Sequence, residues 1–338
     1  NFFSVSGILT YINATISEHF IYMGCIGIFI YFIFLLDRIK REKLKIILII
    51  FVFSLYGVRT ILRNYDWKDP IRFYEKSINH GFKNKKIYYN LASSYFWKGD
   101  YQKALETFKI AENLYKNKKI VYQGIAVCYY SMEKYKEAED YYKKILQIDP
   151  SDPFALVSLA TIYYNNKTKP VSEIIEILKR CIDKNPAYRN AYVLLGRIFY
   201  ENGNYKESLK YLKIAVSIKP EDDISQLLLG LSYFFTGNKE MSEKHLNYAY
   251  KLNPQKLENI INLAIFYKLT GQFDKSIEFY EKVIKIKPDD FDSLNDIALC
   301  YALKGEKEKA RKIWEEILKR NPEYYPAKEN LKILKKKE

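Results

Sequence analysis

A small residue returns along most of this chain at a nearly constant interval. It occurs at Ala92, Ala126, Ala160, Gly196, Gly230, Ala264 and Ala298, in steps of 34, 34, 36, 34, 34 and 34 residues. Three positions after each of them stands an aromatic residue: Tyr95, Tyr129, Tyr163, Phe199, Tyr233, Tyr267 and Tyr301. Prolines recur in phase at Pro150, Pro186, Pro220, Pro254, Pro288 and Pro322. A period of this length predicts a solenoid of stacked helical repeats.

Each recurring residue has a role in a pair of helices. Ala or Gly lets the first helix approach the second closely, the dipeptides "GD", "GN" and "GQ" supply the turn, and Pro ends the second helix. The stretch "YYNNKTKPVSEIIEILKRCIDKNP" departs from this pattern, because it has two extra residues and lacks the Gly turn. We place the insertion in the turn between its two helices, where extra length costs little.

The pattern resembles the tetratricopeptide repeat, most closely in "NLASSYFWKGDYQKALETFKIA" at 90–111 and "LLGRIFYENGNYKESLKYLKIAVSIKP" at 194–220. This predicts an all-α superhelix of seven repeats at 85–118, 119–152, 153–188, 189–222, 223–256, 257–290 and 291–324. Residues 68–84 are expected to form a lone helix that leads into the first repeat. Residues 325–338 are expected to form a capping helix, whose lysines keep the far end of the stack solvated.

The resemblance implies that the first helix of each repeat lines a concave groove. Mapped onto this sequence, one groove position per repeat gives an aromatic column, and nearby positions add further aromatic residues. The predicted groove residues are Tyr89, Phe96, Trp97, Tyr130, Tyr164, Tyr200, Phe234 and Phe235. Such a groove would bind a protein or peptide ligand through an apolar or aromatic segment. The alternative is that these side chains pack against neighbouring repeats or line a tightly wound superhelix.

No residue pattern in the chain argues for catalysis. There is no Gly-rich phosphate loop, no nucleophile elbow and no pair of carboxylates that could be placed on one face. The four cysteines and three histidines are scattered without metal-site spacing, so we predict no metal and no cofactor. The net charge of +15 is spread through helices that also carry Asp and Glu, which speaks against a nucleic-acid partner.

Two apolar stretches precede the repeats. Residues 19–36 contain no formal charge, and residues 44–62 are apolar apart from Lys45 and Arg59. Both have the length of a membrane-spanning helix, whereas buried core helices, the alternative, usually keep a polar stripe. The loop "DRIKREKLK" between them is basic, so the positive-inside rule places it in the cytoplasm and the repeats outside. Residues 1–67 are therefore predicted to be a membrane region.

The segment "RNYDWKD" at 63–69 follows the second apolar stretch. Trp67 has the amphipathic ring that favours the headgroup layer, and Arg59 and Arg63 lie one helical turn apart, within reach of lipid phosphates. We predict that these three residues anchor the chain at the membrane interface.

A second resemblance joins "SEHFIYMGCIGI" at 17–28, "RTILRNYDWKDPIRFYEKSI" at 59–78 and the repeats in the same order. Together they are similar to the C-terminal part of the transmembrane and tetratricopeptide-repeat protein O-mannosyltransferases and their prokaryotic relatives. His19 stands where that family usually has Arg. The resemblance implies a multi-spanning glycosyltransferase that uses a lipid-linked sugar and carries its repeats outside the cytoplasm. The family's catalytic residues would precede Asn1, so no catalytic residue is assigned.

Three readings of the function follow. The first is a membrane-anchored repeat domain that positions protein substrates or partners for an upstream transferase; because Asn1 is not followed by a signal peptide, we expect the chain to be the C-terminal piece of a longer protein. The second is a membrane-tethered scaffold for envelope assembly with no enzyme attached. The third places the repeats in the cytoplasm as a chaperone-type adaptor.

Overall fold

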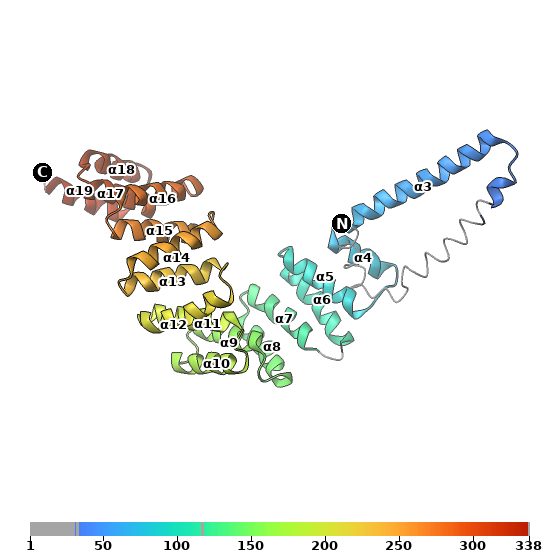
Figure 1. Ribbon diagram of the computed structural model, residues 1–338, viewed down its shortest axis with the longest axis horizontal. Helices are drawn as coiled ribbons and strands as arrows, with labels where there is room; N and C mark the ends of the chain where they lie inside the picture. Colours follow the sequence, from blue (N-terminus) through green and yellow to red (C-terminus); the bar gives the residue numbers. More distant parts are fainter. Residues whose placement is uncertain (1–30, 32–33, 116–117, 337–338) are drawn as a thin grey trace. The chain divides into compact units, whose positions relative to one another are not determined.

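The computed structural model describes residues 31, 34–115 and 118–336, without the side chains of residues 56, 59–67, 335 and 336. Within these residues the chain is all-α and contains no strand (Figure 1). It divides into two compact units, Asn1–Ile162 and Tyr163–Glu338. The predicted fold class, an all-α solenoid of helix pairs, is confirmed for the repeat region.

The first unit contains a series of helices, most of which pack on the next one along the chain. They are α3 (Glu42–Lys68), α4 (Pro70–Asn79), α5 (Lys85–Trp97), α6 (Tyr101–Leu114), α7 (Lys119–Ser131), α8 (Tyr135–Ile148) and the larger part of α9 (Pro153–Asn165). Leu105 and Phe108 from α6 and Ile125 and Cys128 from α7 meet in one buried cluster. Burial raises the pKa of the Cys128 thiol to about 12, so this cysteine stays protonated and serves as a small apolar residue.

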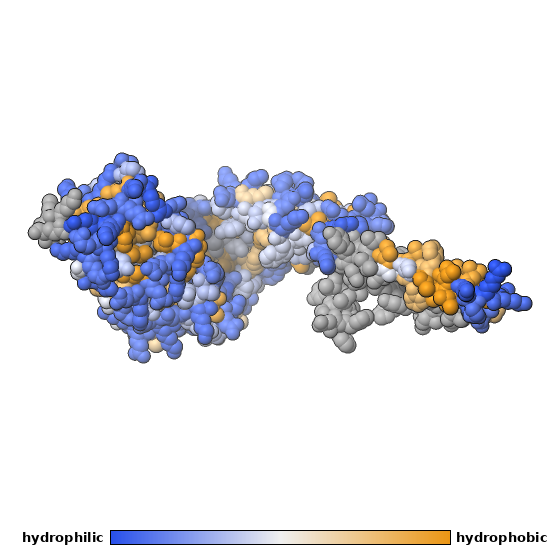
Figure 2. Space-filling model, turned by 90° about the horizontal axis from the view of Figure 1, so that it is seen from above, coloured by the Kyte–Doolittle hydropathy of each residue, from blue (hydrophilic) through white to orange (hydrophobic). Residues whose placement is uncertain are grey.

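The helix α3 contains the second predicted membrane span, 44–62. Many of its apolar side chains are exposed, among them Ile47, Ile50, Phe51 and Phe53 (Figure 2). Across the residues that the structure describes, however, no helix combines the length and the apolar character needed to cross a bilayer. The first predicted span, 19–36, falls almost entirely outside the described residues, and so do the side chains of Arg59, Arg63 and Trp67.

Asp69 separates α3 from the lone helix that was predicted before the repeats. It has extended backbone angles, and its carboxylate accepts hydrogen bonds from the backbone N–H groups of Ile71 and Arg72. Because it satisfies two of the free N–H groups at the start of α4, Asp69 is a helix N-cap. The last residue of "RNYDWKD" therefore begins the helix that contacts the first repeat.

The second unit continues the series with α10 (Val171–Lys184), α11 (Arg189–Glu201), α12 (Tyr205–Ile218), α13 (Asp223–Phe235) and α14 (Lys239–Leu252). It ends with α15 (Leu257–Leu269), α16 (Phe273–Ile286), α17 (Phe291–Leu303), α18 (Lys307–Arg320) and α19 (Tyr325–Lys336). Neighbours in sequence pack against each other from α10 to α19, and α13 also contacts α11 and α15. We refer to the first helix of each pair as the A helix (α5, α7, α9, α11, α13, α15 and α17) and to the second as the B helix.

The recurring small residues lie where the two helices of a pair come closest. The side chains of Ala92, Ala126, Ala160, Ala264 and Ala298 are completely buried. At Gly196 an added Cβ would lie 2.5 Å from Cγ of Leu212 on the paired B helix, and at Gly230 it would lie 2.9 Å from Cγ of Leu246. Larger residues are excluded from these two positions by contact with a buried leucine.

The turn between the helices of a pair needs one residue with positive φ. Gly99, Gly203, Gly237, Gly271 and Gly305 supply it, with φ between 74° and 87°. In the second repeat Glu133 takes this conformation at φ 59° without being a glycine. The two extra residues of the third repeat lie in its turn, because α9 ends at Asn165 and α10 begins at Val171, and Lys167 has φ 53° there.

Candidate peptide-binding surface

The predicted groove residues of the first unit pack mainly within their own repeat. The ring of Phe96, near the end of α5, lies 5.3 Å from that of Tyr101, the first residue of α6. Tyr130 and Tyr135 repeat this contact across the next turn, at 5.5 Å. Trp97 is 85% exposed, and its ring makes an edge-on contact with that of Phe96, with centroids 5.8 Å apart.

Tyr89 belongs to a different group of rings. Its centroid lies 5.5 Å from that of Phe108, a buried residue of α6, and 6.4 Å from that of Tyr115. Burial raises the pKa of the Tyr89 hydroxyl. Tyr89 is therefore a half-buried part of the packing between α5 and α6, the two helices of its own repeat.

In the second unit the structure brings the aromatic residues of two repeats together. The rings of Tyr205 and Phe235 stack, with centroids 4.5 Å apart and an interplanar angle of 11°. Tyr200 lies against both of them, at 5.6 and 5.9 Å, and Phe234 contacts Phe235 at 5.5 Å. We call these four residues, Tyr200, Tyr205, Phe234 and Phe235, the aromatic shelf. Phe235 is 51% exposed, so part of the shelf faces solvent.

Tyr164 is held by hydrogen bonding to the end of the next A helix. Its hydroxyl donates to Oε2 of Glu201 over 2.7 Å, and Nε of Arg197 donates to the other oxygen of that carboxylate, also over 2.7 Å. Burial, followed by the hydrogen bond to Glu201, raises the pKa of Tyr164 to about 12. The hydroxyl therefore remains a donor throughout the physiological pH range.

The sequence reasoning missed Tyr205, Arg197 and Glu201. A signal for Tyr205 was present, because a tyrosine also stands first in the B helix at Tyr101 and Tyr135, five residues after the column position. The side chain of Glu201 carried no such signal, since an acidic residue at the end of an A helix occurs in only this repeat.

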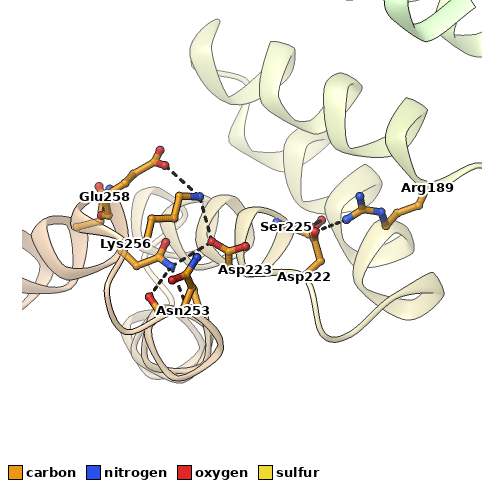
Figure 3. A network of polar contacts seen from close by, with 10 residues as sticks. Arg189, Asp222, Asp223, Ser225, Asn253, Lys256 and Glu258 are labelled. Carbon is orange, nitrogen blue, oxygen red and sulfur yellow. Dashed lines mark hydrogen bonds and ion pairs between the residues drawn. The ribbon is translucent and has the colours of Figure 1, made fainter. Parts of the chain in front are cut away.

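Ion pairs link the start of one A helix to the residue that precedes the next A helix (Figure 3). Arg189 pairs with Asp222, and Nζ of Lys256 lies 3.0 Å from Asp223 and 3.4 Å from Glu258. In the first unit Nζ of Lys119 lies 2.6 Å from Asp152 in the same relation. These contacts fix successive A helices side by side, and all three involve residues 33 positions apart.

Profiles of one family match most of the repeat region. Those described as tetratricopeptide repeat match residues 86–151, 175–223, 225–256, 257–290 and 279–312. The chain belongs to the tetratricopeptide repeat family. This confirms the resemblance drawn from the recurring small residues, aromatics and prolines. Tetratricopeptide repeats build extended surfaces for binding other proteins, so this part of the chain is a protein-interaction domain.

Two known proteins, both longer than this chain, are similar to part of it. The TPR repeat-containing protein MJ1428 of Methanocaldococcus jannaschii is 24% identical over 173 residues, which are 46% of this chain and 29% of that protein. The human protein O-mannosyl-transferase TMTC3 is 22% identical over 187 residues, 51% of this chain and 20% of that protein. The chain thus spans less than a third of the length of either relative.

Two solved structures illustrate the likeness of the fold to known proteins. The APC/C hetero-tetramer Cut9-Hcn1 superposes with a TM-score of 0.59 at 19% identity, covering 78% of this chain and 52% of that one. Pseudomonas aeruginosa pilF superposes with a TM-score of 0.54 at 16% identity, covering 62% of this chain and 95% of that one. At these identities the likeness concerns the fold alone.

Proposed function

We propose that this chain is a membrane-anchored interaction domain that holds protein substrates or partners for a glycosyltransferase using a lipid-linked sugar, of which it forms the C-terminal part. Its repeats lie outside the cytoplasm and bind protein segments with apolar or aromatic side chains. A tethered scaffold without an enzyme would use the same surface and the same anchor, and differs only in what precedes the membrane region.

The exposure of large aromatic side chains at the ends of A helices carries the interaction part of the proposal. Trp97 and Phe235 stand at the same place in their repeats, as the last residue of α5 and of α13, and at least half of each side chain is exposed. Exposed apolar clusters of this kind mark binding surfaces in soluble domains. Neither residue is needed to fill the core of its own repeat.

Two independent features support the transferase part. The similarity to TMTC3 covers half of this chain, and the motifs at 17–28 and 59–78 occur in the order found in that family. The anchor is supported by the two apolar stretches of the sequence, by the basic loop between them and by the exposed apolar side chains of α3.

Replacing Tyr130 and Tyr164 with Ala should weaken partner binding about ten-fold or more, because buried aromatic anchors dominate the energy of such interfaces. To measure binding, the chain would be expressed in cells with a photoreactive phenylalanine analogue at position 97 or 235. The yield of partner protein crosslinked to the chain would report the binding. Tyr164→Phe is the matched control, since it removes only the hydroxyl bonded to Glu201. Far-ultraviolet circular dichroism should show unchanged helix content. Undiminished crosslinking in the double Ala variant would refute the proposed surface.

The anchor and the location of the repeats are tested together by fractionation. We expect the chain to stay with membranes in alkaline carbonate and to be released by detergent, because the two predicted spans, 19–36 and 44–62, would partition into lipid. Protease added to intact spheroplasts should digest the repeats. Protected repeats would instead favour the cytoplasmic adaptor.

Further spans encoded upstream of Asn1, with an acidic pair in the first outer loop, would favour the transferase over the scaffold.

A further inference from the structure

The turn between the two helices of the third repeat is longer than the corresponding turn of every other repeat. It joins α9 to α10 and comprises residues 166–170, whereas the turn between α5 and α6 comprises only residues 98–100 (Figure 1). Its sequence is Asn-Lys-Thr-Lys-Pro, and all five residues are exposed. The two extra residues therefore lie on the surface, outside the packing between helices.

This turn contains the triplet Asn166–Lys167–Thr168, in which a threonine stands two residues after an asparagine. The pattern Asn-x-Ser/Thr, with x other than proline, is the acceptor sequence for N-linked glycans. The chain has one other such triplet, at 13–15, and it lies outside the described residues. Because so short a motif also arises by chance, the surroundings of Asn166 decide whether the triplet can serve as an acceptor.

The turn is held by its backbone. The N–H of Lys167 donates to the carbonyl of Tyr164 over 3.3 Å, and the N–H of Thr168 donates to the carbonyl of Tyr163 over 3.1 Å. Lys167 adopts the left-handed conformation, with φ 53°. In the part of the chain that the structure describes, the side chains of Asn166 and Thr168 form no hydrogen bond. A modification of either side chain would therefore remove no contact that holds the turn.

Other asparagines in the turns of the second unit have a structural task. Asn204 and Asn238 accept hydrogen bonds from backbone N–H groups at the start of α12 and α14. Nδ2 of Asn202 donates to the carbonyl of Ile198. An amide that caps a helix in this way is held against the backbone. The amide of Asn166 is exposed and has no such task, so its Nδ2 is available for reaction.

The turn also stands apart from the exposed apolar ends of the A helices. Within the second unit, α9 and α11 end in the polar residues Asn165 and Glu201. By contrast, α13, α15 and α17 end in Phe235, Leu269 and Leu303, each of which is exposed. A glycan beside Asn165 would precede the first of these apolar ends by two repeats. It would therefore leave them open to a partner protein.

We propose that Asn166 is the acceptor of an N-linked glycan, transferred from a lipid-linked donor by an oligosaccharyltransferase of the membrane. In this reaction Nδ2 of Asn166 forms a bond to the anomeric carbon of the first sugar. The bond from that carbon to the phosphate oxygen of the donor breaks, and the lipid-linked phosphate leaves with the electron pair. One amide proton passes to a base of the transferring enzyme. The assignment rests on the proposed location of the repeats outside the cytoplasm.

Mass spectrometry of the full chain, isolated from the membranes of the cells that produce it, tests the assignment. We expect the proteolytic peptide that contains Asn166 to carry a glycan, and fragmentation of that peptide to place the glycan on Asn166. Asn166→Gln and Thr168→Ala should each abolish the modification, whereas Thr168→Ser should retain it, because serine also completes the triplet. Asn165→Gln is the matched control. It changes an exposed neighbour that has no hydroxyl two residues on, and the glycan should remain.

Two results would overturn the assignment. One is an unmodified Asn166 in the chain from membranes, and the other is a glycan on Thr168 that survives Asn166→Gln and so reveals transfer to oxygen. Protease treatment of intact spheroplasts separates these failures from a failure of the proposed location. If the repeats are digested but Asn166 is unmodified, only the acceptor is wrong. If the repeats are protected and Asn166 is unmodified, the location outside the cytoplasm fails, and the acceptor assignment fails with it.

Discussion

Gly196→Ala should lower the free energy of unfolding by about 1–3 kcal/mol. The added Cβ would stand 2.5 Å from Cγ and 2.6 Å from Cδ2 of Leu212. Leu212 is completely buried and cannot move out into solvent, so its side chain must shift within a closely packed interior, or α11 and α12 must separate. Denaturant unfolding followed by circular dichroism measures the loss. Amide hydrogen exchange should show that it is largest in these two helices.

The contact with Leu212 can be isolated with two further variants. Leu212→Ala alone should destabilise through the cavity that it leaves, but combined with Gly196→Ala it makes room for the new methyl group. The double variant should therefore lose less than the sum of the single losses. Gly57→Ala is the matched control, since nothing lies within 4 Å of its Cβ position in α3, and it should cost no stability. Strict additivity of the two substitutions would contradict close packing at Gly196.

The sequence predicted the helix pairs well because the responsible interactions are local or strictly periodic. The buried alanines, the glycines with positive φ and the extra residues between Asn165 and Val171 all act within one repeat. Glu133 could not be anticipated in the same way. It adopts the left-handed conformation in place of glycine, because the surrounding helices α7 and α8 fix the turn whatever residue occupies it.

The arrangement of side chains was predictable only in part. The column positions are aromatic in the sequence itself, but sequence spacing does not say which ring a side chain turns toward. Tyr200 joins Tyr205 and Phe235, whereas Tyr164 points its hydroxyl to Glu201. The ion pairs were hidden for another reason. The basic residue comes first in Lys119–Asp152 and Arg189–Asp222 but second in Asp223–Lys256, so the order of the charges is not the same in every pair.

Trp314 joins the last three helices at one point. Its side chain is 2% exposed and packs with Ala298 of α17 and Leu334 of α19. The indole Nε1–H donates to Oδ1 of Asn295 over 3.0 Å, and Nδ2 of Asn330 donates to the same oxygen over 2.9 Å. The predicted capping helix is thus held by its packing on Trp314 and by the hydrogen bond from Asn330 to the Asn295 oxygen that also accepts from Trp314.

Trp314→Ala should cost about 3–5 kcal/mol, the usual price of removing a fully buried large aromatic residue. Because each repeat contacts mainly its neighbours, the loss should stay near the C-terminal end. Amide exchange should accelerate strongly in α17, α18 and α19 and remain unchanged in α5 to α8. Trp97→Ala is the matched control, since that tryptophan is 85% exposed, and it should change stability by less than about 0.5 kcal/mol. If Trp314→Ala accelerated exchange in α5 to α8 by the same factor, the solenoid would unfold as one cooperative body rather than repeat by repeat.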